Sequence, residues 1–502
     1  MPSPRQQPPP LPGVTPPHPT RTPTYPPTNP TEPASLSNIH LCESFLLQQQ
    51  QSDQLLHSWR QGLLFIDSTY RHEPPDFRST WRRFLSRRNK IALRELMAAI
   101  VHCIVLASTD FDPAEQPSPT HSPAPFWWLL VHLECLILAP SARESRDGVS
   151  INQAIAQRIA SVRAGAIEDT FKEAMGVSSW KTPADRPERE DNRAAQEAAD
   201  NDNFRAAHAR VCNNNPIASI GAHNEPILHS LYAPPLPPLG HPTPPPKHAH
   251  QPVHLPGDIC ATIKRASKCT GAGVNADSVD AFIDLATLNI ASVNDDLRRL
   301  FDLVFQGLLP PSIAVYFTDA YLFLLHKDPD DPTKLRPIAI PSGMRRLTAS
   351  HIMASYRQRF AIDMLPLNYA IGVDGGMDFI VKTVQLGIEK HISLPQSRNE
   401  LPTRAAVFLD LKNMFNNISR EELMNIIAAD YPELLAIANL LYHDPGGIHY
   451  RWEDGSWRKT HMQEGVNQGC PLSSLFATLV LLRVLRPLNC LMRERDGQAP
   501  ET

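Results

Sequence analysis

The chain has 502 residues, which exceeds the usual size of a single hydrophobic core and predicts two or more structural units joined by linkers. Its 48 basic and 52 acidic residues give a formal net charge of -4, so any contact with nucleic acid must depend on local basic patches. The eight cysteines show no CxxC or zinc-finger spacing. This pattern favours reduced thiols and excludes a dense disulfide framework.

Residues 1–38 are a proline-rich tail. Residues 1–35 contain 14 prolines among polar residues, a composition that cannot bury enough apolar surface to fold. We expect the tail to be disordered, and its "PPPLP" motif is a candidate ligand for an SH3 or WW domain. The N-terminus has no apolar signal segment, so we expect an intracellular protein, in the nucleus or cytoplasm, and not a secreted one.

Residues 39–180 have the pattern of a small helical domain, with apolar residues at three- and four-residue spacing. The most apolar stretch, Phe126–Leu138, is too short to span a bilayer and predicts a core helix, so no membrane contact is expected. A basic cluster with interleaved aromatic residues, Trp81–Lys90, could contact nucleic acid or form a solvated helix face.

Residues 181–256 become polar and then rich in proline and histidine, which predicts an extended linker. Its histidines could bind a metal only weakly, because no packed scaffold fixes their geometry. They are His241, His248, His250 and His254.

The pattern of folded structure resumes at about residue 257. Asp277 is placed to cap a helix, with Asp280 at the third position. Two apolar runs around a loop of proline and aspartate predict a β-hairpin from Ala320–His326 and Arg336–Pro341.

The run Ala405–Leu411 has the length and apolar character of a buried strand, with Asp410 near its end. A lone carboxylate there could cap a helix, form an ion pair or bind a metal. Ser419 and Glu422 have capping-box spacing and account for the cap of the following helix without Asp410.

Four segments together resemble the reverse transcriptases of non-LTR retrotransposons and group II intron-like elements. They are "VFLDLKNMFNN" with Asp410 and Phe415, "GVNQGCPLSSLF" (Gly465–Phe476), "KLRPIAIPSGMRRL" (Lys334–Leu347) and "LNYAIGVDGGMDFIVKTVQLGIE" (Leu367–Glu389). The resemblance covers about residues 257–495 and implies an α+β right-hand polymerase. Its fingers would be residues 257–345 and its partial, ferredoxin-like palm residues 346–502.

The resemblance implies RNA-templated DNA synthesis, with an RNA template, a DNA primer and deoxynucleoside triphosphates as partners and Mg2+ or Mn2+ as cofactor. Asp410 and the Leu411 carbonyl would bind the metal, with Asp410 the catalytic carboxylate. Phe415 would exclude a 2′-hydroxyl from the nucleotide site, although a plain core aromatic is the alternative. Lys334 and Arg336 would neutralise the triphosphate.

The same resemblance places Gln468 at the incoming sugar and Gly469 beside the template base. Ser473 or Ser474 would cap the helix that follows. Arg345 and Arg346 are candidates either for contact with template phosphates or for a surface role.

The third palm motif of this family is absent from the sequence. In the family, that motif is an aromatic residue, then any residue, then two adjacent aspartates. One carboxylate cannot hold two magnesium ions against hydration, so we expect the chain to be inactive on its own. A catalytically dead RNA- or DNA-binding protein and a non-functional pseudogene product remain as alternatives. Without the neighbouring hairpin, we expect residues 346–502 to be prone to aggregation or only partly ordered on their own.

Overall fold

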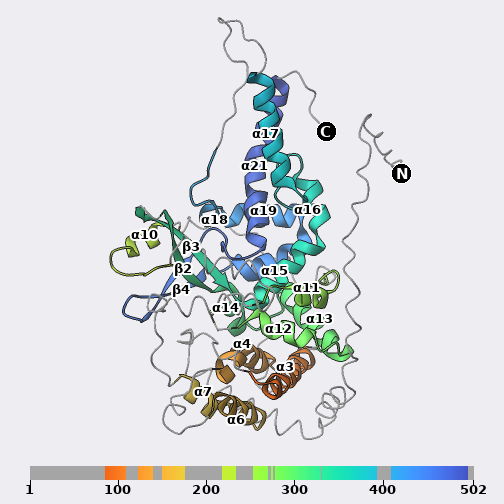
Figure 1. The fold of residues 1–502 in the computed structure, drawn as a ribbon. Coiled ribbons are helices and arrows are strands. Elements are labelled where there is room, and N and C mark those ends of the chain that lie inside the picture. The colour runs from red at the N-terminus through yellow and green to blue at the C-terminus, as the bar shows by residue number, and fades with distance from the viewer. Residues whose placement is uncertain are drawn as a thin grey trace, which may run out of the picture. The chain divides into compact units, whose positions relative to one another are not determined.

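A computed structural model of the chain describes residues 85–108, 122–138, 150–175, 217–232, 253–268, 273–274, 277–328, 331–392 and 409–495. All of these residues belong to one compact unit, Phe45–Thr502. Most of the helices lie to one side of, and below, a mixed five-stranded sheet, so the fold is α+β, as the sequence predicts (Figure 1). The predicted disordered tail and most of the predicted linker lie outside the described residues.

Four described helices lie in the region predicted as a helical domain. They are α3 (Arg87–Ala107), α4 (Ala124–Leu138), α6 (Ile151–Arg163) and α7 (Ile167–Met175). Every residue of α4 after Ala124 is buried, which confirms the predicted core helix. Arg87, Arg88 and Lys90, from the predicted basic cluster, are exposed at the start of α3, whereas Trp81 to Phe84 lie outside the described residues.

A second group of helices packs against α3 and α4. The group comprises α11 (Ile259–Arg265), α12 (Val279–Ala286), α13 (Ala291–Phe305), α14 (Pro311–Thr318), α15 (Gly343–Ser355) and α16 (Arg357–Met364). The two groups are linked by buried polar contacts: the Glu134 carboxylate accepts a hydrogen bond from the Ser278 amide at 2.7 Å. Arg94 on α3 also forms an ion pair with Asp284 on α12 at 3.5 Å.

Asp277 does not cap the helix that follows it, contrary to the sequence prediction. Ser278 is the N-cap residue of α12, and the Asp277 carboxylate instead accepts hydrogen bonds from the amides of Gly343 and Met344. These amides belong to the first turn of α15, where amides lack intrahelical partners. A cap 66 residues away along the chain cannot be read from local spacing.

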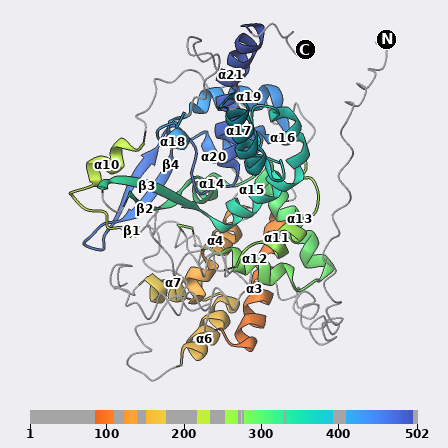
Figure 2. The ribbon, with the colours of Figure 1, turned by 45° about the horizontal axis from the view of Figure 1, so that its top comes forward.

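The sheet is built on an antiparallel hairpin of β2 (Ala320–Asp328) and β3 (Asp331–Pro341), which confirms the predicted hairpin and extends it toward the turn. The start of β2 also pairs in parallel with β4 (Gly446–Arg451), which pairs antiparallel with β5 (Trp457–Met462). Figure 2 shows the strands from a second direction.

The remaining strand of the sheet, β1, comes from inside the predicted linker. Residues 217–232 contain β1 (Ile217–Ala218), which pairs with β2, and α10 (Glu225–Ser230), which contacts β3. Arg458 on β5 holds α10 through Glu225 at 3.1 Å. This part of the predicted linker is therefore folded onto the sheet.

The C-terminal part of the chain is mostly helical. Its elements are α18 (Met414–Asn417), α19 (Arg420–Asp430), the 3-10 helix η4 (Pro432–Leu434), α20 (Leu435–Tyr442) and α21 (Leu472–Arg495). The Ser419 hydroxyl accepts a hydrogen bond from the Glu422 amide, so the predicted N-terminal cap of α19 is confirmed.

Leu409 to Leu411, the described end of the predicted buried strand, are neither in a strand nor buried, and Leu409 is 83% exposed. That prediction is wrong for these residues. Leu409 and Leu411 are apolar, but no strand among the described residues covers them, and Ala405 to Phe408 lie outside that part of the chain.

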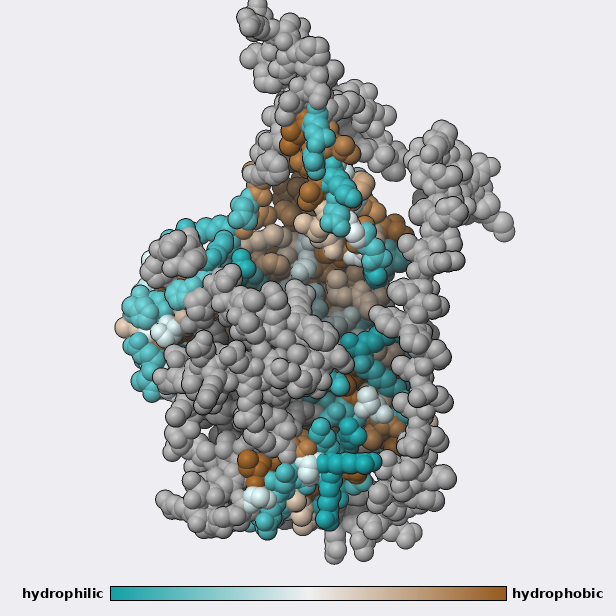
Figure 3. Space-filling model, in the orientation of Figure 1, coloured by the Kyte–Doolittle hydropathy of each residue, from teal (hydrophilic) through white to brown (hydrophobic). Residues whose placement is uncertain are grey.

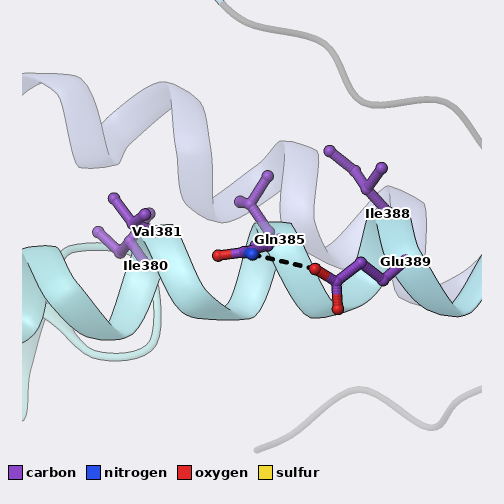
Figure 4. Close-up of a pocket in the computed structure, with 6 residues that line it drawn as sticks. Ile380, Val381, Gln385, Ile388 and Glu389 are labelled. Atoms are coloured by element: carbon purple, nitrogen blue, oxygen red, sulfur yellow. Dashed lines mark hydrogen bonds between the residues drawn. The ribbon is translucent and has the colours of Figure 1, made fainter.

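Exposed apolar side chains gather on two long helices, α17 (Gly376–Ile392) and the second half of α21, which run side by side (Figures 1 and 4). They are Met377, Phe379, Val381, Leu386 and Ile388 on α17, and Val484, Leu488, Leu491 and Met492 on α21. Figure 3 shows hydrophobic surface over this part of the molecule, and Figure 4 shows a groove along α17.

Of the helices that the structure describes, α21 alone is long and apolar enough over Leu472–Met492 to cross a membrane by length and composition. The first half of this window is largely buried in the protein, and the helix contains Arg483, Arg486 and Pro487. A single candidate of this kind is weak evidence for a membrane span, because core helices meet the same criterion.

Candidate functional site

The loop between β5 and α21 lies between two segments that are distant in sequence. On one side, its Val466 amide donates a hydrogen bond to the Phe415 carbonyl at 2.7 Å, and its Gly465 amide donates to the Ile418 carbonyl at 2.9 Å. Gly465 has a positive φ of 75°, and a Cβ there would lie 2.4 Å from the Phe415 carbonyl oxygen. Only glycine fits this approach to α18 without strain.

On its other side, the loop contacts the end of β3. A Cβ on Gly469 would lie 2.2 Å from the Ala339 carbonyl oxygen and 3.4 Å from the Pro341 ring. The loop is therefore in backbone contact with both α18 and β3. Three of the segments singled out in the sequence meet here, around Phe415, Gln468 and the β3 strand.

Phe415 lies on α18, a single helical turn, and its ring is partly buried against the core. The turn begins at Asn413, whose φ of 53° is left-handed, a conformation that asparagine tolerates better than most residues. The side-chain amides of Asn413 and Asn416 both donate to the Leu231 carbonyl, which fixes α18 against the end of the 217–232 segment. Gln468 and Gly469 are partly exposed beside it.

Lys334 and Arg336 lie on β3, and both side chains are exposed. They alternate with buried Leu335 and therefore share the exposed face of the hairpin. Lys334 also forms an ion pair with Asp331 at 3.6 Å. Arg336 precedes the contact at Ala339 by three residues, a separation of about 10 Å along a strand.

Asp410 and Leu411 lie four or more residues before Phe415, and both side chains are exposed. A divalent metal with oxygen ligands needs several carboxylates that converge on one point. Within the described ranges, no group of three or more His, Cys, Asp or Glu side chains could hold a metal ion. The described residues therefore do not fit the metal site that the resemblance implies.

His254, the described member of the linker histidines, bonds instead to Asp302, with 2.6 Å between its Nδ1 atom and the carboxylate. Cys135, Cys260 and Cys470 are buried thiols, and burial raises the pKa of Cys135 to about 12. The Cys135 thiol is therefore protonated at neutral pH.

Arg345 is not a surface residue, and it cannot contact a template phosphate from its position. Its side chain is 1% exposed and donates to the Phe317 carbonyl and the Tyr442 hydroxyl, both at 2.7 Å. Arg346 is more than half-buried, and burial lowers its pKa while Asp277 and Asp280 oppose that shift. Neither the predicted contact with template phosphates nor the predicted surface role is correct for Arg345, because partners distant in the sequence bury its side chain.

Neither Ser473 nor Ser474 caps α21, because the helix begins at Leu472. The Ser473 hydroxyl donates instead to the Asn467 carbonyl in the loop at 2.6 Å and is buried. Ser474 is exposed. The serine prediction is therefore wrong about the partner, although Ser473 does stabilise the segment before the helix.

Three buried residues hold this loop in place, and the sequence indicated only one of them, Ser473. Arg420 donates through Nε to the Gly465 carbonyl at 2.9 Å, and it also donates to the Tyr442 and Asp444 carbonyls. Tyr442 and Ser473 complete the set. Arg420 directly follows the helix cap in sequence, where an exposed first-turn residue is the ordinary expectation, so no local signal distinguishes it.

No protein-family model matches the sequence, and no curated protein is significantly similar to it.

Proposed function

We propose that the chain is a reverse transcriptase-like protein of a retroelement. Residues 257–345 would form the fingers and residues 346–502 a partial palm of a right-hand polymerase. In this proposal the chain binds an RNA template, a DNA primer and a deoxynucleoside triphosphate. The supporting observation is that the loop of Gln468 and Gly469 is in backbone contact with both α18 and β3.

This contact matters because the three segments are separated by more than 40 residues from one another in the chain. In this proposal the partly exposed residues Phe415, Gln468 and Gly469, on the loop and on the α18 turn that it contacts, supply an aromatic ring, an amide side chain and a glycine backbone to one site. Lys334 and Arg336, exposed farther along the same strand, supply positive charge suited to a triphosphate. Phe415 is the candidate for contact with the sugar.

We propose further that the chain binds these partners without extending the primer. The resemblance implies a metal-dependent transfer, and the described residues offer Asp410 alone at the expected place. The same observation favours the second candidate function, a nucleic-acid-binding protein without catalysis. The two candidates differ in one property, which is recognition of the nucleotide that pairs with the template.

The test uses the full chain and a fluorescently labelled DNA primer annealed to an RNA template. Affinity is measured by anisotropy over a range of salt concentrations, first alone and then with a complementary or a non-complementary deoxynucleoside triphosphate. We expect the logarithm of the affinity to fall linearly with the logarithm of the salt concentration, because binding to phosphates releases counterions. We also expect the complementary nucleotide alone to tighten the complex, with no extension of the primer.

Salt-dependent binding without a nucleotide effect would favour the plain nucleic-acid-binding protein. Absence of any salt-dependent binding would refute both candidates and leave the non-functional product. Extension of the primer by the purified chain would contradict the proposed lack of catalysis.

A further inference from the structure

A buried cluster of two arginines and one tyrosine lies beneath the loop of the candidate site. Tyr442, at the end of α20, lies between Arg345 and Arg420, whose guanidinium carbons are 5.0 and 5.3 Å from the centre of the tyrosine ring. All three side chains are buried. We call these residues the Arg–Tyr–Arg cluster.

The hydrogen bonds from Arg345 toward the loop can run in one direction only. Arginine cannot accept a hydrogen bond, so Arg345 donates to the Tyr442 hydroxyl at 2.7 Å. The Ser473 hydroxyl has one hydrogen, which it donates to the Asn467 carbonyl at 2.6 Å. In the 3.3 Å contact between the two hydroxyls, Tyr442 must therefore be the donor. The chain of donors runs from Arg345 through Tyr442 and Ser473 to the loop.

A second connection reaches the loop from Arg420, which donates to the Gly465 carbonyl. Burial lowers the pKa of Arg420 to about 10, so its side chain is still charged at neutral pH. Its backbone amide donates to the Glu464 carboxylate at 2.9 Å, which ties the start of α19 to the same stretch of chain. The loop thus has two fixed carbonyls, at Gly465 and Asn467.

A further contact fixes the loop beyond these two carbonyls. The Cys470 amide donates to the Asn467 carbonyl at 2.9 Å. Gln468 and Gly469 lie between these fixed points. They cannot move far without breaking a buried hydrogen bond, and a buried polar group without its partner is unfavourable.

We propose that the Arg–Tyr–Arg cluster, acting through Ser473, positions Gln468 and Gly469 for the incoming nucleotide. Arg345, Tyr442, Arg420 and Ser473 are then positioning residues, because none of them is exposed to a ligand. The inference rests on the proposed function, since it assigns a role in the same site. A loop held in its binding conformation loses less entropy when the nucleotide binds.

The experiment compares Ser473→Ala with Ser474→Ala in the full chain. Ser473→Ala removes the side-chain donor to the Asn467 carbonyl and leaves the bond from the Cys470 amide in place. Ser474→Ala removes an exposed hydroxyl from the adjacent position and is the matched control. The two readouts are amide hydrogen exchange at Gln468 and Gly469 and the tightening of the primer–template complex by the complementary nucleotide.

We expect Ser473→Ala to speed exchange at Gln468 and Gly469. It should also reduce the nucleotide-dependent tightening by about fivefold, the effect of one lost hydrogen bond. Affinity for the primer–template alone should stay as in the wild type, because that affinity depends on phosphate contacts. Tyr442→Phe, which keeps the ring between the two guanidinium groups and removes the hydroxyl, should have the same effect in a protein with its fold intact.

The inference is overturned if Ser473→Ala and Tyr442→Phe leave the nucleotide-dependent tightening at its wild-type value. It is also overturned if Ser474→Ala reduces the tightening as strongly as Ser473→Ala does. A wild-type chain that shows no nucleotide effect instead contradicts the proposed function itself, so the two failures are distinguishable.

Discussion

Replacing Gly465 by alanine tests whether the loop of the candidate site is held against α18. Gly465 has a φ of 75°, where an alanine residue is disfavoured by about 1–2 kcal/mol. Its Cβ would also lie 2.4 Å from backbone atoms of Phe415 and Asn416, and such overpacking is unfavourable by about 1–3 kcal/mol. Together these effects predict a loss of about 2–5 kcal/mol in the free energy of opening this part of the chain.

Gly455→Ala is the matched control. Gly455 has a similar φ of 86°, but its nearest neighbouring atom lies 3.7 Å away in the flexible Arg451 side chain. Only the conformational effect of about 1–2 kcal/mol should remain, and it should be confined to the turn between β4 and β5.

The assay is hydrogen exchange at the Val466 amide, which bonds to the Phe415 carbonyl. Gly465→Ala should speed this exchange by about 30-fold or more, the equivalent of at least 2 kcal/mol, and Gly455→Ala should leave it unchanged. Equal exchange rates at Val466 in Gly465→Ala and the wild type would refute the close contact between the loop and α18.

Three further predictions concern stability and solubility. Burial alone would raise the pKa of Asp319, but its bonds to His449 and Lys459 hold it below its ordinary value. The stabilising effect of the charged Asp319 carboxylate is present above pH 4 and is lost as the pH falls through its lowered pKa. Asp319→Asn should therefore destabilise the protein by about 3–5 kcal/mol at pH 7. It should also make the free energy of urea unfolding depend less on pH in the acid range. Burial raises the pKa of Asp277 from 3.8 to about 6 despite bonds to two amides, so its carboxyl group favours folding at low pH and loses that advantage as the pH rises to 6. The difference of about two pH units is worth about 3 kcal/mol, so Asp277→Asn should be more stable than the wild type at pH 8, but not at pH 4, in the same measurement. Leu488→Lys, at an exposed apolar position on α21, should lower light scattering on concentration and change the unfolding midpoint little, because the position contributes no core packing.

Each of these predictions has a clear contrary outcome. An acid limb unchanged in Asp319→Asn would show that other carboxylates dominate unfolding at low pH. Equal stability of Asp277→Asn and the wild type across the whole pH range would show that folding does not change the pKa of Asp277. Undiminished scattering of Leu488→Lys would place the source of aggregation away from α21.

Local patterns in the sequence predicted the elements that depend on neighbouring residues. The cap of α19 is formed by Ser419 and the Glu422 amide, three residues apart, so its spacing alone was sufficient. The β2–β3 hairpin is likewise a local structure, in which two apolar runs flank a short turn. The buried helix α4 followed from its predominantly apolar composition.

Long-range contacts determine the features that the sequence did not predict. Arg345 resembles a surface residue in sequence, but its partners are Phe317 and Tyr442, 28 and 97 residues away. Asp277 caps a helix 66 residues downstream for the same reason. The nucleotide-binding roles of the loop and of β3 remain predictions, whereas the buried positions of Arg345 and Arg420 depend on contacts that appear only in the folded chain.

In the proposed function, Lys334 and Arg336 serve a nucleotide site that includes the Gln468 loop. The most direct test is the double variant Lys334→Ala/Arg336→Ala, compared with Arg299→Ala, which removes an exposed charge from α13. In the primer–template assay, the double variant should reduce tightening by the complementary nucleotide by at least about tenfold, because each charge-assisted bond contributes about 1.5–3 kcal/mol. Arg299→Ala should leave the tightening unchanged.

Wild-type tightening in the double variant would contradict the claim, since a triphosphate bound at this site could not be indifferent to both charges. Loss of tightening in Arg299→Ala to the same degree would contradict it equally, because the effect would then reflect net charge and not this site.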